Sequence, residues 1–176
     1  MTAAEKLIKD GYRRRREHRL DDAMHAFTEA VTSARAAADS PVLARALVGL
    51  ARIERDRKHL DEAYTNYAAA EQIVRTLDDA LWLAHVVRHL GDVLREQGRF
   101  AEAAPRYAES LSIYRNTADP DELDFANALR GAALNADVLD ERTAARHLWR
   151  EARALYASAE IVAGVEESDR QVARLS

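Results

Sequence analysis

The chain has 176 residues, of which 48% are hydrophobic, and this is enough apolar material for one domain with a substantial core. It contains no cysteine, which excludes disulfides and thiolate metal sites, and its net charge of −4 argues against general affinity for nucleic acid. Charges interrupt every apolar run before it reaches the length of a signal peptide or membrane span, so we expect a cytoplasmic protein that binds no membrane. Arginine outnumbers lysine 23 to 3, which we interpret as the mark of a GC-rich, bacterial genome.

A small residue followed four positions later by an aromatic one recurs at intervals of 40, 40 and 42 residues. The four pairs are Ala23 and Phe27, Ala63 and Tyr67, Ala103 and Tyr107, and Ala145 and Trp149. Self-similarity at such a period is typical of a solenoid, in which each repeat buries its apolar face against its neighbours. Because Ala, Leu, Glu and Arg dominate and only six glycines and three prolines occur, the repeats are expected to be helical.

Each repeat is predicted to be a helix hairpin, because apolar residues recur at steps of three and four between regularly placed turn residues. The predicted first helices are 3–17, 42–57, 81–97 and 123–137, within repeats at about 3–38, 41–78, 80–118 and 121–158. Ser40-Pro41 and Asp119-Pro120 are interpreted as caps that restart helices. Pro105 is expected either to kink its helix or to delay its start. The apolar residues after Tyr156 predict a capping helix at about 160–175, which completes a single domain over 1–176.

The third repeat carries Leu90-Gly91, Gly98, Phe100, Ala103 and Tyr107, and this pattern resembles the tetratricopeptide repeat family. The resemblance covers almost the whole chain. Its period exceeds the usual 34 residues and is similar to the long-helix repeats of kinesin light chains. It implies an all-α, right-handed α-solenoid of four hairpins with a C-terminal capping helix.

The resemblance also implies that the first helices line a concave groove that holds a segment of a partner protein. The groove positions carried over to this chain include Tyr12, Arg15, Arg45, Arg52, Arg55, His85, Arg88, Arg95, Asn127 and Arg130. Their excess of positive charge favours an acidic partner, since guanidinium groups bind carboxylates bidentately. The equally weighted alternative is that these arginines pair with neighbours such as Asp56, Asp92 and Glu96 in a solvated lattice.

Other chemistry has weaker signals. The run from Arg13 to Arg16 covers every side of a helix, so it is interpreted as a solvated helix end rather than a nucleic-acid site. His85 and His89 are four residues apart, but no third ligand is placed to complete a metal site. No nucleophile, acid–base pair or glycine-rich phosphate loop is present, so we expect no catalysis, cofactor or metal.

Three hypotheses for function follow. The leading one is a non-enzymatic scaffold that binds another protein, with an acidic segment in the groove. The alternative is a regulatory module that senses a peptide or small ligand and acts with a separate effector protein. The third is end-to-end self-association, because an array of four repeats leaves apolar ends.

Overall fold

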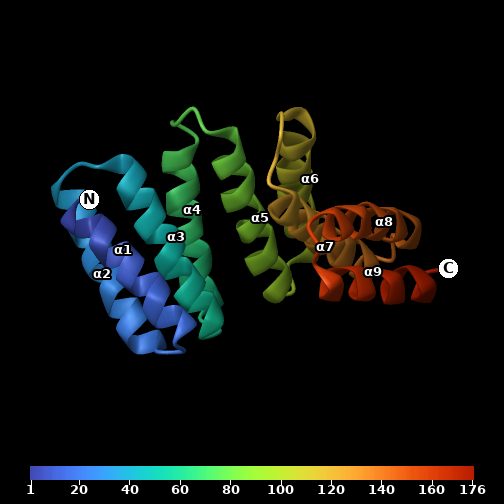
Figure 1. Cartoon of the computed structure of the whole chain (residues 1–176), viewed down its shortest axis with the longest axis horizontal. Helices are drawn as coiled ribbons and strands as arrows, with labels where there is room; N and C mark the ends of the chain where they lie inside the picture. The colour runs from blue at the N-terminus through green and yellow to red at the C-terminus, as the bar shows by residue number, and fades with distance from the viewer. The chain divides into compact units, whose positions relative to one another are not determined.

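The computed structural model describes residues 1–176 and contains nine α-helices and no strand, so the all-α prediction is confirmed. Each predicted first helix begins and ends within two residues of its expected position. Figure 1 traces the helices in chain order. Their bounds are α1 Ala3–Arg16, α2 Leu20–Ala36, α3 Ser40–Asp56, α4 Leu60–Val74, α5 Ala80–Glu96, α6 Phe100–Asn116, α7 Glu122–Val138, α8 Arg142–Ser158 and α9 Val162–Arg174. None of these helices is long and apolar enough to cross a membrane.

The chain divides into two compact units, Met1–Asp79 and Ala80–Ser176, and the expectation of a single domain stays a prediction. In unit 1, α1 packs on α2, α3 packs on α4, and α3 also contacts α1 and α2. In unit 2, α5 packs on α6 and α7 packs on α8, while α7 also contacts α5 and α6, and α9 covers α8. Consecutive first helices therefore lie side by side within each unit.

The repeated small and aromatic residues form the core of the hairpins. Ala23, Ala63, Ala103 and Ala145 are fully buried, and the aromatic residue of each pair is at most 1% exposed. Glycine brings the helix backbones close to these rings: a Cβ atom on Gly49 would lie 2.1 Å from the Phe27 ring. In the last hairpin, Trp149 packs against Leu175 and Val172, so the final helix closes this end of the core as predicted.

The turns inside the hairpins share one unusual backbone conformation. His18, Lys58, Gly98 and Asp140 follow the first helices at equivalent positions, and all have φ between 58° and 77°. At the second turn, the backbone N–H of Lys58 donates to Arg55 and that of His59 to Glu54, as in a Schellman motif. Only Gly98 adopts this left-handed conformation without a side-chain penalty.

The helix starts correct two details of the sequence interpretation. The cap of α3 is Asp39 rather than Ser40, and its carboxylate accepts a hydrogen bond from the Val42 N–H at 3.1 Å. The cap of α7 is Asp121, which lies after Pro120, rather than Asp119. Both carboxylates satisfy N–H groups that the helix itself leaves unbonded.

Pro105 lies inside α6, five residues after the helix begins, so the expected later start is wrong. The side chain is exposed. Its ring replaces the N–H that would bond the carbonyl of Ala101, which leaves a weak point in the first part of the helix.

Candidate partner-binding faces

The predicted groove residues of unit 1 lie on two adjacent first helices. Tyr12 and Arg15 belong to α1, whereas Arg45, Arg52 and Arg55 belong to α3. We call this set the α1–α3 face. Because α1 and α3 are in contact, these five residues lie on neighbouring helices.

Contacts across the α1–α3 face orient its arginines. Arg15 binds Asp56 through two hydrogen bonds, from Nε to Oδ2 at 2.6 Å and from Nη2 to Oδ1 at 3.2 Å. This carboxylate raises the pKa of Arg15. The Arg52 guanidinium lies 5.8 Å from the centre of the Tyr12 ring, which in turn makes an edge contact with Phe27. Tyr12 is therefore both a core contact and a platform for a cation.

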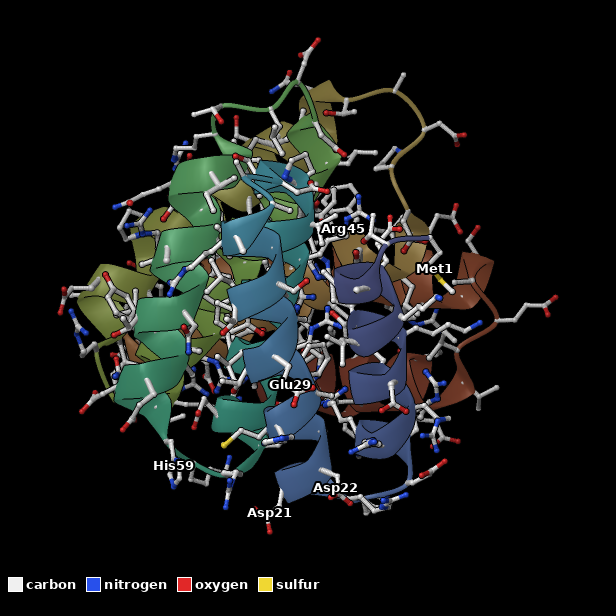
Figure 2. All side chains as sticks on the ribbon, turned by 90° about the vertical axis from the view of Figure 1, so that its left-hand side faces the viewer. Met1, Asp21, Asp22, Glu29, Arg45 and His59 are labelled. Atoms are coloured by element: carbon white, nitrogen blue, oxygen red, sulfur yellow. The ribbon has the colours of Figure 1, made fainter.

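Arg45 is the most exposed arginine of this face. Figure 2 shows Arg45 and Met1 at the same end of unit 1, opposite the end that carries Asp21, Asp22 and His59. Arg45 is therefore distant from Asp21 and Asp22, and its acidic neighbour is Glu5, whose pKa is lowered by the Thr2 backbone hydrogen bond and also by the charge of Arg45. The guanidinium is exposed and accessible to a partner.

The predicted residues of unit 2 also lie on adjacent first helices, and we call them the α5–α7 face. His85, Arg88 and Arg95 belong to α5, whereas Asn127 and Arg130 belong to α7. Most of their polar atoms are engaged within the fold.

Arg88 is only 7% exposed and binds two carboxylates. Its Nη1 donates to Asp92 at 3.0 Å, and its Nη2 lies 3.5 Å from Asp124. Asp92 also accepts a hydrogen bond from the Tyr107 hydroxyl at 2.8 Å, and His85 Nδ1 lies 2.7 Å from Asp124. Burial raises the pKa of Tyr107 well above its ordinary value, so it stays a hydrogen-bond donor. These contacts join α5 to both α6 and α7.

The α7 side of this face is bonded to the elements that follow it. Arg130 binds Glu167 of α9 through two hydrogen bonds of 2.7 Å each, and this carboxylate raises the pKa of Arg130. Asn127 Oδ1 accepts a hydrogen bond from the Tyr156 hydroxyl at 2.9 Å. Arg95 lies beside the Tyr107 hydroxyl, and its charge opposes the rise in the tyrosine pKa.

The sequence interpretation missed Asp124 and Glu167 as partners of these arginines. Each lies one repeat after the residue it binds: Arg15 and Asp56 are 41 residues apart, His85 and Asp124 39, and Arg130 and Glu167 37. A search for opposite charges at about one period would have found these pairs.

The run of four arginines and the pair of histidines on α5 form contacts within the fold. In the run of four arginines, Arg13 contacts Asp10 and Glu17, Arg14 binds Asp10, and Arg15 binds Asp56. The rings of His85 and His89 meet edge to face at 4.6 Å, and no group of three metal-binding side chains occurs in the chain.

Residues 42–116 match the tetratricopeptide repeat family. This part of the chain contains tetratricopeptide repeats. In this family the fold is generally a scaffold for protein interactions. No curated protein sequence matches the chain.

Solved structures share the fold of these tetratricopeptide repeats. The kinesin light chain TPR-like repeats of Podosopora anserina superpose with a TM-score of 0.79 at 15% identity, over 97% of this chain and 84% of that one. The BtubC (BKLC) protein of P. vanneervenii superposes with a TM-score of 0.71 at 15% identity, over 99% and 91% of the two chains. RapI in its apo form gives a TM-score of 0.80 at 15% identity, and this chain spans 46% of its length. The predicted helical-repeat solenoid is thereby confirmed.

Proposed function

We propose that this protein is a non-enzymatic scaffold that holds a segment of another protein on the faces formed by its first helices. The observation that carries the proposal is the stripe of arginines on the α1–α3 face of a tetratricopeptide repeat fold. Preformed helices support such binding, because a rigid surface loses little conformational entropy when a partner associates.

An acidic segment is the partner chemistry that this stripe favours. Guanidinium groups bind carboxylates through paired hydrogen bonds, and Arg15 already holds Asp56 in this way. Unit 1 contains fourteen basic and fourteen acidic residues, whereas unit 2 contains twelve and sixteen, so the whole net charge of −4 belongs to unit 2. We therefore assign the acidic contact to the α1–α3 face. On the α5–α7 face, Arg88 and Arg130 are already bound to internal carboxylates.

The test is affinity enrichment from a cell lysate with mass spectrometry, comparing the native protein with an Arg45→Glu, Arg52→Glu variant. A matched control, Arg146→Glu, Arg150→Glu, makes the same charge change on α8. We expect a protein that the native chain and the control retain and that the α3 variant loses. Retention by all three chains would contradict the assignment of the α1–α3 face.

The same partner allows the acidic chemistry to be tested directly. Raising the salt concentration should weaken binding to the native chain more than binding to an Arg45→Gln variant, which lacks one charge of the face, because exposed ion pairs are screened. Equal salt dependence of the two chains would show that the contact is not ionic. Calorimetric titration with peptides from the captured protein, compared with the whole protein, distinguishes this scaffold from the alternative of a peptide sensor.

A further inference from the structure

A crevice of about 150 Å³ lies between α6 and α8 of unit 2, with α7 as its floor. Its walls and floor are mainly alanine: Ala104 and Ala108 belong to α6, Ala144 to α8, and Ala132 and Ala136 to α7. An apolar protein cavity of about this volume, 150 Å³, takes up one benzene-sized ring. The size and lining therefore suit a single aromatic ring.

Several small side chains of this crevice stand where another repeat has a larger one. The floor residues Ala132, Asn135 and Ala136 stand where the preceding first helix has Leu90, Val93 and Leu94. Ala104 stands where α2 of unit 1 has Met24, whose sulfur contacts Arg57 at 3.3 Å. The packing that these larger residues supply elsewhere is missing here.

Asn135 gives the floor one polar group. The side chain is 2% exposed, and its Nδ2 donates to the carbonyl oxygen of Phe100 at 3.1 Å. This bond fixes the orientation of the Asn135 amide, because the flipped amide would place Oδ1 against the carbonyl oxygen of Phe100. The other amide atom, Oδ1, is buried and has no hydrogen-bond partner. Tyr107 lines the crevice with its ring, but its hydroxyl already donates to Asp92.

Glu141 supplies a negative charge to the lining of the same crevice. It is exposed, it caps the start of α8 through its backbone only, and its carboxylate forms no ion pair. The crevice thus combines an apolar slot, a buried acceptor and an unpaired carboxylate.

We propose that this crevice binds a small aromatic amine, a protonated arylethylamine whose ring carries one N–H or O–H donor. The ring lies between the alanines of α6 and α8, the donor bonds Asn135 Oδ1, and the ammonium group pairs with Glu141. This site belongs to unit 2 alone and is independent of the α1–α3 face.

The test is calorimetric titration of the full chain with tyramine, which has one ring with a hydroxyl donor, followed by the same titration of an Ala108→Leu variant. Ala108 is exposed, so leucine fits there without disturbing the core, and a thermal melt checks that the variant folds. We expect tyramine to bind the native chain and the leucine side chain to abolish binding. Absence of binding to the native chain, or unchanged binding to the folded variant, would overturn the proposal.

Two further comparisons test the polar contacts. Glu141→Gln should weaken tyramine binding by up to about fivefold, because an ion pair with an exposed carboxylate contributes no more than roughly this factor. The control Asp140→Asn removes a neighbouring charge outside the crevice and should leave the affinity unchanged. Tyramine methylated on its hydroxyl oxygen lacks the donor for Asn135 and should bind more weakly than tyramine. Equal affinities in either comparison would refute the corresponding contact.

Discussion

Asp92 is the side chain on which the polar contacts of unit 2 converge. It is 6% exposed, and it accepts hydrogen bonds from Arg88 of its own helix and from Tyr107 of the next. A buried carboxylate is stable only when its charge is paired and its oxygens are hydrogen-bonded. Both conditions are met here, so the groove position predicted at Arg88 is a structural contact of the hairpin as well as part of its face.

His89 lies beside this network and makes the stability of the protein depend on pH. Burial lowers the pKa of His89 well below its ordinary value, and the positive charges of Arg88 and His85 lower it further. A hydrogen bond to Asp92 and the charge of Asp92 act in the opposite direction and raise it. The unfolded chain therefore takes up a proton below about pH 6.5 that the folded chain excludes. Stability should fall as the pH falls through this range, by up to about 1.4 kcal/mol per pH unit.

Urea denaturation of a His89→Gln variant between neutral and mildly acidic pH tests this dependence. The variant should lose stability less steeply than the native chain as the pH falls. His25→Gln is the matched control, because His25 is 76% exposed and lies outside this buried network. Parallel profiles for the native chain and the His89 variant would show that this histidine titrates alike in both states.

At the scale of the helix, Pro105 lies inside α6 although proline disfavours a helix interior. A proline inside a helix lowers the free energy of unfolding by about 3 kcal/mol. Because proline also restricts the unfolded chain, it raises the same free energy by about 0.4 to 1 kcal/mol. Because the side chain is exposed, Pro105→Ala should raise the free energy of unfolding by the difference, about 2 to 2.6 kcal/mol. A thermal melt at fixed pH measures the change. A lower melting temperature would mean that the proline has a packing contact in the fold.

Helices and their apolar contacts could be predicted because they depend on local spacing. The small-aromatic pairs marked Tyr67 and Trp149 as core residues, and both are fully buried. The pairing of Arg130 with Glu167 could not be placed, because it spans 37 residues and depends on the register between two helices. The crevice at Asn135 also escaped prediction, since it depends on how one repeat differs from the others.

At the scale of the whole molecule, the contacts described for unit 2 are all internal to residues 80–176. The Asp92 network and the Trp149 core both lie within this unit. A fragment of Ala80–Ser176 should therefore be helical by circular dichroism and should unfold in one cooperative transition. A spectrum typical of an unfolded chain would show that unit 2 depends on residues before Ala80.

The left-handed turns have a consequence for how this protein can change over evolution. The same backbone geometry occurs at His18, Lys58, Gly98 and Asp140, but only Gly98 reaches it without side-chain strain. At each of the other three turns, substitution by glycine should therefore relieve this strain and raise the stability of the fold. None of them belongs to the α1–α3 or α5–α7 face. Mutations that alter the binding faces at some cost in stability can thus be compensated at the turns, which leaves the faces free to acquire new partners.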